Sequence, residues 1–284
     1  MRRLPLHPAA VYGVVKEIKA AAEDLSPLVV AGAEGRASEL VAALAEGGDT
    51  SALRDFSGRE VTRYDLQGAA LLLYVVSGEK PSAEDEQVLK LADRNDVDAV
   101  CVLVGANSTP VDVAYVPATR VVAVPPGRPL PVDRIAELVA SLTDETGYAL
   151  AARLPVVREA VVEAIVRRFA RQNGVLGVAI FIPGADFPVL TLNQLRMVFR
   201  IAAAHGEEID RERIPEVLAV VGAGLGFRTV AREALGFVPG LGWAIKGGVA
   251  YAGTKALGKA ATAYFEQGGA HALSRAADAV RSRS

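Results

Sequence analysis

The 284 residues contain 51% hydrophobic and 23% charged side chains, and a mean hydropathy of +0.27 is compatible with a sizeable buried core in two domains. This composition excludes a chain that is disordered throughout, and a single cysteine, Cys101, excludes an internal disulfide. Three widely separated histidines and one cysteine form no zinc or haem ligand set, so we predict no metal and no cofactor. No secretory segment opens the sequence, and we therefore expect a cytoplasmic protein.

Charge is distributed unevenly along the chain. Residues 1–150 contain 22 acidic and 14 basic residues, a net charge of −8, whereas residues 151–284 contain 11 acidic and 17 basic residues, a net charge of +6. A cationic half rich in Gly and Ala suits an anionic membrane surface or an acidic protein partner. Ordinary solvated arginines on helices are the alternative. Nucleic acid is not expected as a partner, because no Lys/Arg cluster alternates with aromatic residues.

A leading helix is predicted over residues 8–24, within an N-terminal segment of residues 1–24. The following residues, 25–146, alternate between short apolar runs and helical patterns. The predicted strands are residues 28–31, 60–65, 69–76, 98–104 and 120–124, and the predicted helices are 37–45, 83–92 and 132–142. Apolar runs such as LLLYVV need cover on both faces, which is typical of parallel strands flanked by helices. The sequence therefore predicts a doubly wound α/β domain.

Residues 147–284 carry only helical patterns, and we predict an all-α helical domain. The predicted helices are 153–173 with Asn173-Gly174 as C-terminal cap, 192–205, 214–235 and 241–265. No run of eighteen apolar residues occurs, so no transmembrane helix is predicted.

The segment LVVAGAEGRASELVAAL, Leu28–Leu44, has the strand, glycine turn and helix of a P-loop. A working loop needs G-x-x-x-x-G-K-[ST], whose lysine reaches the β and γ phosphates. If Gly35 is aligned with the second glycine of the motif, Arg36 takes the lysine position and Ala37 takes the position of the hydroxyl residue. If Ser38 is aligned with the hydroxyl residue instead, Ala37 takes the lysine position. We therefore predict a vestigial site that has lost its nucleotide. Its candidate residues are Gly32, Gly35, Arg36 and Ser38.

The order of elements over residues 25–142 resembles that of an Era-like small GTPase. LLLYVVSGEKPSAEDEQVLKLA is similar to the strand and helix that follow switch II, and VCVLVG to the strand that precedes the guanine-binding N-K-x-D motif. Asn107–Pro110 replaces that motif without its lysine and aspartate, and PPG replaces the Ser-Ala-Lys turn. The D-x-x-G match at Asp65–Gly68 is interpreted as chance. The resemblance implies a P-loop-GTPase-like domain without intact nucleotide motifs, a pseudo-GTPase.

The second half carries a sharper resemblance. IPGADFPVLTLNQLRMVFRIAAAHG and FVPGLGWAIKGGVAYAGTKALGKAATAYFEQGG resemble the YcjF-type domain of unknown function that accompanies Era-like GTPases in bacteria, over residues 174–269. The resemblance implies a bacterial protein that associates with membranes and indicates no reaction.

Small residues recur every four positions near the end of the sequence and form a flat ridge. They are Ala244, Gly248, Ala252 and Ala256. Such a ridge lets a neighbouring backbone approach, in a helix bundle or at an interaction surface. Asp186, Gln194 and Lys246 are predicted to be surface or capping residues, and the glycines at 222, 224 and 226 to serve helix packing.

Two hypotheses about function follow. The first is a non-catalytic interaction protein, in which a pseudo-GTPase domain is joined to a basic helical domain that engages a membrane surface, as a peripheral protein of the inner membrane, or a protein partner. The second is a divergent nucleotide-binding switch that uses the loop Gly32–Ser38. No catalytic residues are predicted, because no serine, histidine and acid set or carboxylate pair occurs at a known spacing. Association into a homo-oligomer stays open.

Overall fold

The computed structural model describes residues 8–107, 111–179, 186–207 and 242–268. The chain forms two compact units, which we call the α/β unit, Glu23–Val161, and the helical unit, Met1–Ala22 with Val162–Ser284. Both units share α7 (Pro155–Ala179), the helix in which the boundary lies. The division predicted from the sequence, after residues 24 and 146, is a different partition and stays a prediction.

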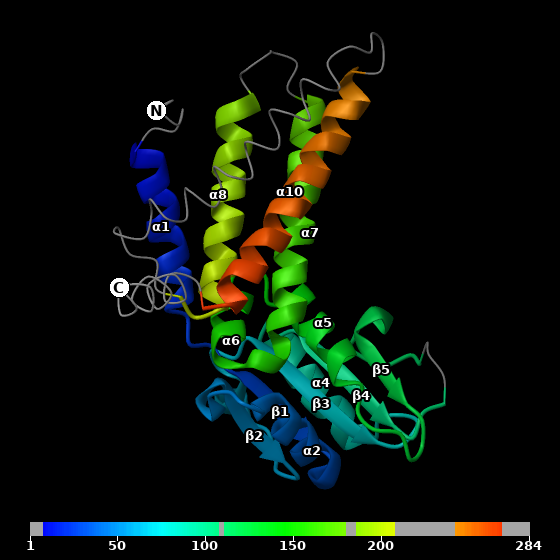
Figure 1. Ribbon diagram of the computed structural model, residues 1–284. Coiled ribbons are helices and arrows are strands. Elements are labelled where there is room, and N and C mark those ends of the chain that lie inside the picture. Colours follow the sequence, from blue (N-terminus) through cyan, green and yellow to red (C-terminus); the bar gives the residue numbers. More distant parts are fainter. Residues whose placement is uncertain (1–7, 108–110, 180–185, 208–241, 269–284) are drawn as a thin grey trace, which may run out of the picture. The chain divides into compact units, whose positions relative to one another are not determined.

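The α/β unit is built on one parallel sheet (Figure 1). Its strands are β1 (Leu28–Gly32), β2 (Leu53–Ser57), β3 (Leu71–Ser77), β4 (Ala99–Val104) and β5 (Val121–Val124). Its helices are α2 (Glu34–Ala45), α3 (Arg63–Leu66), α4 (Ala83–Arg94), α5 (Val132–Leu142) and α6 (Gly147–Arg153), with 3-10 turns at Thr50–Ala52 and Ala118–Arg120. The strand order β2-β1-β3-β4-β5 is that of the flavodoxin-like doubly wound sheet. The predicted parallel α/β architecture is confirmed.

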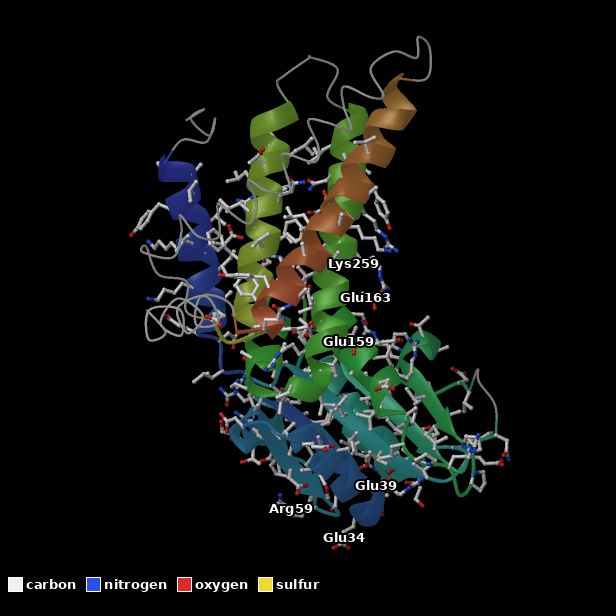
Figure 2. All side chains as sticks on the ribbon, in the orientation of Figure 1. Glu34, Glu39, Arg59, Glu159, Glu163 and Lys259 are labelled. Atoms are coloured by element: carbon white, nitrogen blue, oxygen red, sulfur yellow. The ribbon has the colours of Figure 1, made fainter. Side chains whose placement is uncertain are left out.

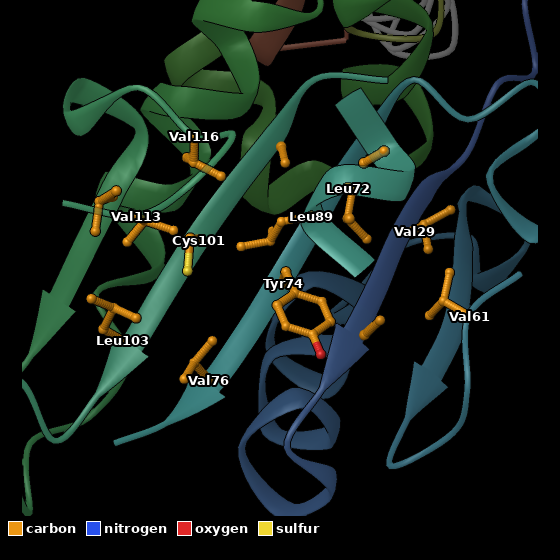
Figure 3. Close-up of a cluster of buried hydrophobic side chains, with 14 of the residues drawn as sticks. Val29, Val61, Leu72, Tyr74, Val76, Leu89, Cys101, Leu103, Val113 and Val116 are labelled. Atoms are coloured by element: carbon orange, nitrogen blue, oxygen red, sulfur yellow. The ribbon is translucent and has the colours of Figure 1, made fainter. Parts of the chain in front are cut away.

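Alternate residues of the central strands enter two different cores. Figure 3 shows one of them, where Leu72 and Cys101 of the sheet meet Leu89 of α4. The neighbouring strand residues point to the other face, which α2 covers with the buried Ala37, Leu40 and Leu44. Burial on both faces explains why these strands are continuous apolar runs.

One predicted strand, residues 60–65, is wrong. The strand in this region is β2, and residues 63–66 form α3 instead. Thr62 and Asp65 explain the helix, because the Thr62 N–H donates to Asp65 Oδ2 at 2.8 Å and the pair forms a capping box. β2 was missed because this edge strand has no fully buried residue.

Four helices are described in the helical unit (Figure 1). They are α1 (Pro8–Ala22), the part of α7 from Val162, α8 (Asp186–Ala204) and α10 (Gly242–Glu266). The predicted helix 214–235 and the glycines at 222–226 lie outside the described residues. Within the described ranges, no helix has the length and apolar character needed to cross a membrane.

The predicted helix end at Asn173-Gly174 is wrong, because α7 continues to Ala179. Asn173 is fully buried, and its amide donates to Thr254 Oγ1 of α10 at 3.0 Å. Its side chain is therefore committed to a neighbouring helix, and the absence of a Cβ at Gly174 leaves room for Tyr251 of α10. Asn173 and Gly174 match the sequence pattern of a helix cap, but in the structure they serve the packing of α7 against α10.

The small-residue ridge of α10 does not pack against another described helix. Gly248, Ala252 and Ala256 are exposed, and a Cβ added to Gly248 would meet no atom within 4 Å. The side chain of Ala244 lies outside the described residues. The close approach occurs at Gly258 on another face of α10, where a Cβ would lie 2.6 Å from Val166 Cγ2 of α7. The role of the ridge as an interaction surface stays a prediction.

Candidate functional site

The turn that resembles a P-loop is too short to surround a phosphate. β1 ends at Gly32 and α2 begins at Glu34, so Ala33 alone connects them. The Ala33 N–H donates to the Val75 carbonyl at 2.8 Å, and a Cβ on Gly32, whose φ is +108°, would lie 2.0 Å from that oxygen. The main chain of the turn is thus closed against β3. Gly32 is needed for this close approach, which explains the glycine without a ligand.

The side chains around the same turn also oppose a nucleotide. Glu34 occupies the first position of α2 and is exposed (Figure 2), so the helix N-terminus already has its own anion. Arg36 donates to Glu39 Oε2 at 2.6 Å and to the Arg128 carbonyl at 2.7 Å. Gly35 and Ser38 are exposed on the helix. The four predicted residues therefore lie together, but Arg36 is held by neighbouring protein groups.

Polar groups near the carboxyl ends of the strands are satisfied locally. Asp55 accepts hydrogen bonds from the Ser57 hydroxyl at 2.6 Å and the Ser57 N–H at 2.8 Å, and these bonds lower the pKa of Asp55. The Tyr74 hydroxyl donates to Asp85 Oδ1 at 2.9 Å, while burial raises the pKa of Tyr74. Across the described part of the chain, no group of His, Cys, Asp and Glu could hold a metal. Among the described residues, this edge of the sheet therefore offers no ligand site.

A different site lies in the helical unit, where a surface cavity of about 740 Å³ is lined by α1, α7 and α8. Its volume falls within the range of roughly 300–1,000 Å³ that is common for small-molecule sites. The polar lining consists of Arg168, Arg171, Gln172, Asn193, Arg196, Arg200 and Glu17. The apolar lining consists of Phe169, Val175 and Leu176. We call this the arginine cavity.

Helical spacing brings the four arginines to the cavity in two pairs. Arg168 and Arg171 are three residues apart on α7, and Arg196 and Arg200 are four apart on α8, so each pair shares one helix face. The Arg200 residue is only 6% exposed, and its guanidinium carbon lies 5.4 Å from the centre of the Phe169 ring. Arg200 is thus a buried cation that the apolar ring of Phe169 helps to hold.

Glu17 of α1 is the acidic residue of the lining. Arg200 Nη2 donates to Glu17 Oε1 at 3.3 Å, and Arg196 Nη2 donates to Glu17 Oε2 at 3.5 Å. These separations are longer than the 2.7–2.9 Å of tight charge-assisted hydrogen bonds. Arg196 Nε is buried and has no hydrogen-bond partner. One loosely bound carboxylate therefore faces two guanidinium groups, with donor capacity left on Arg196.

A buried polar cluster connects the cavity wall to α10. Thr254 Oγ1 accepts from Asn173 Nδ2 at 3.0 Å and from Gln194 Nε2 at 3.4 Å, and it donates to the Ala250 carbonyl at 2.7 Å. Asn193, which lines the cavity, donates to Asn173 Oδ1 at 3.2 Å. Gln194 is 2% exposed, so its predicted surface or capping role is wrong. The side chains of Asp186 and Lys246 lie outside the described residues.

Sequence reasoning missed the arginine cavity because its charges come from three helices. Glu17 is far from the arginines in sequence, and each arginine by itself fits a solvated helix. One clue was available in RMVFRIAAA, where Arg200 stands between Phe199 and Ile201 in an otherwise apolar stretch. An arginine in that setting indicates a buried cation that needs a partner.

Comparison of the chain with protein-family models and with curated proteins gave no match in either case. The resemblances to Era-like GTPases and to the YcjF-type domain therefore stay predictions.

Proposed function

We propose that this chain is a non-catalytic interaction protein whose helical unit engages the anionic surface of a membrane. The observation that carries the proposal is the arginine cavity, whose lining contains four arginines and one glutamate. The surrounding unit adds to the attraction, because its sequence contains 19 basic and 11 acidic residues, a net charge of +8. Each cationic residue near an anionic membrane surface contributes about 1 kcal/mol.

A membrane explains the cavity better than an acidic protein does because the lining is not purely cationic. Phe169, Val175 and Leu176 form an apolar part of the wall, and Val175 is 68% exposed. A phospholipid offers an anionic headgroup next to apolar chains, which matches both parts of the lining. An acidic peptide would match only the arginines.

The α/β unit belongs to the same proposal as a GTPase-like scaffold that binds no nucleotide. The one-residue turn after β1, the exposed Glu34 at the start of α2 and the engagement of Arg36 by Glu39 all support this part. The sequence of the unit contains 22 acidic and 12 basic residues, a net charge of −10, which also disfavours polyphosphates. No observation favours the nucleotide-binding switch over this scaffold. Calorimetry with magnesium GTP and ATP should give no binding in the micromolar range.

The membrane proposal is tested by sedimentation of the full chain with vesicles. We expect binding to phosphatidylcholine vesicles that contain phosphatidylglycerol, weaker binding as salt rises, and no binding to phosphatidylcholine alone. Equal binding to charged and neutral vesicles, or none to either, would contradict the proposal. Loss of vesicle binding together with stable binding of a polyglutamate peptide would favour the acidic protein partner instead.

A further inference from the structure

We propose that the arginine cavity is a specific site for one phosphate monoester carried on an apolar chain. This inference rests on the proposed function only where the phosphate belongs to a membrane lipid. The chemistry itself is shared by phosphatidic acid in a bilayer and by a soluble alkyl phosphate. The experiment below separates these two sources.

The charge balance of the lining selects a multivalent anion. Four guanidinium groups and one carboxylate leave a formal surplus of three positive charges. A phosphate monoester carries about 1.5 to 2 negative charges and three strong acceptor oxygens. A carboxylate or a phosphodiester carries one charge, and so would neutralise less of the lining.

The donors of the cavity come from two helices and can surround a compact group. Guanidinium groups bind phosphate through two parallel N–H donors, which gives both charge and direction. Arg196 contributes a buried Nε without a partner, while its Nη2 makes only the long contact to Glu17. The side chain of Arg171 on the facing helix α7 is exposed and forms no ion pair or hydrogen bond with any described residue. These groups provide donors that the protein itself uses little.

Glu17 occupies the position of a competing anion. Its two oxygens meet Arg196 and Arg200 at 3.5 and 3.3 Å, and both contacts would be exchanged for phosphate contacts when a ligand enters. A dianion with three oxygens attracts the pair more strongly than one carboxylate does. Removal of the Glu17 charge should therefore strengthen phosphate binding.

The size and apolar wall of the cavity require more than inorganic phosphate. A volume of about 740 Å³ far exceeds one phosphate group. Phe169, Val175 and Leu176 supply apolar surface beside the arginines. Each CH₂ group of a ligand chain that is buried against this wall adds to the affinity. The ligand is thus a phosphate with an apolar body.

The first experiment compares phosphatidic acid with phosphatidylglycerol in vesicles of matched surface potential, using the full chain. Phosphatidic acid is a monoester and phosphatidylglycerol a diester, so we expect at least about tenfold tighter binding to phosphatidic acid. Arg171→Gln should abolish that preference, whereas Lys259→Gln should keep it. Lys259 is an exposed residue of α10 outside the cavity lining (Figure 2). Lys259→Gln therefore removes one positive charge, as Arg171→Gln does, but leaves the cavity intact.

The second experiment uses a soluble probe and a glutamate pair. Calorimetry with octyl phosphate, below the concentration at which it forms micelles, should give one site per chain, and octanoate should bind at least about tenfold more weakly. Glu17→Gln should tighten octyl phosphate binding several-fold. Glu163→Gln removes the same charge from α7 outside the lining (Figure 2) and should leave the affinity unchanged.

The outcomes separate the site from the membrane. Equal binding to the two anionic lipids, with no response to Arg171→Gln or Glu17→Gln, overturns the site while the membrane proposal survives. One-site binding of octyl phosphate without vesicle binding supports the site and assigns it a soluble ligand, and the membrane proposal fails. If the chain binds neither the anionic vesicles nor octyl phosphate, both the phosphate site and the membrane proposal are overturned. Thermal unfolding of each variant is measured alongside, and an unfolded Arg171→Gln protein is replaced by Arg196→Gln.

Discussion

The two units of the chain differ in how many polar groups they bury. In the described parts, the helical unit buries five polar or charged residues, Asn173, Thr191, Gln194, Arg200 and Thr254, whereas the α/β unit buries one, Thr143. The α/β unit keeps its polar groups near the surface and uses them locally, as Ser82 and Asp85 do in capping α4. Its cores are apolar and its P-loop-like turn is closed.

This difference shows that the unit whose sequence resembles a binding motif need not be the unit whose polar groups are free to bind a ligand. The α/β unit has a parallel sheet whose first turn resembles a P-loop, but its candidate arginine, Arg36, is already engaged. The helical unit has no catalytic motif, yet it holds arginines, a loosely paired carboxylate and a buried donor without a partner. Buried polar groups need partners, so the helical unit is where a ligand has the most to add.

The largest expected effect tests whether the P-loop-like glycine is structural. Gly32→Ala places a Cβ within 2.0 Å of the Val75 carbonyl oxygen and forces alanine to a φ of +108°. We expect the α/β unit to lose on the order of 3 to 5 kcal/mol. Alkylation of the buried Cys101, measured against denaturant concentration, reports this loss within the α/β unit.

Gly35→Ala is the control for that substitution. Gly35 lies in α2 with open space around it, so alanine should be neutral or should stabilise by up to about 1 kcal/mol. If both substitutions destabilise equally, the turn is not the closed structure described above.

The second prediction compares two glycines on α10. Gly258→Ala brings a methyl group within 2.6 Å of the Val166 side chain, and we expect a loss of about 1 to 3 kcal/mol. Gly248→Ala adds its methyl group to open space in a helix and should stabilise by about 0.5 to 1 kcal/mol. Far-UV circular dichroism of the helices follows both unfolding transitions. The reverse order of stabilities would place the helix contact on the small-residue ridge.

Much of the α/β unit could be predicted from the sequence because its strands are buried on both faces. Continuous apolar runs marked β1, β3, β4 and β5, and helix α5 has the bounds that the spacing predicted. Edge strand β2 escaped because its residues are only partly buried, and the bounds of α7 escaped because Asn173 bonds to another helix. The same reason hid the arginine cavity. A charge difference between the halves was visible, but the meeting of three helices around Glu17 is a property of the tertiary structure.

The third prediction concerns the buried polar cluster. Thr254→Val keeps the shape of the side chain but removes the acceptor of Asn173 Nδ2 and Gln194 Nε2. Leaving buried donors unsatisfied costs about 1 to 3 kcal/mol, and we expect the lower half of that range because the Gln194 contact is long. Gln194→Met should be nearly neutral, since Gln194 Oε1 is buried without a partner already. Denaturant midpoints followed by far-UV circular dichroism compare the two variants, and equal losses of stability would show that Gln194 contributes as much as Thr254.

The last prediction uses alkaline pH, to which the apolar core of the α/β unit should respond. Burial raises the pKa of the Cys101 thiol to about 12 and raises the pKa of Tyr74, whose bond to Asp85 acts in the same direction. Both groups are neutral when protonated, so the fold favours the protonated form. An unfolded chain loses these protons near pH 8.5 and 10, and above those values it binds fewer protons than the folded chain. The stability that these two groups contribute is therefore fully present below about pH 8.5 and falls as pH rises toward the folded pKa values.

Tyr74→Phe tests this argument. The variant loses about 1 kcal/mol of stability at neutral pH together with its hydrogen bond, and it should show a shallower fall in the urea midpoint above about pH 10. Identical slopes for wild type and variant would mean that Tyr74 ionises in the folded chain as readily as in the unfolded one.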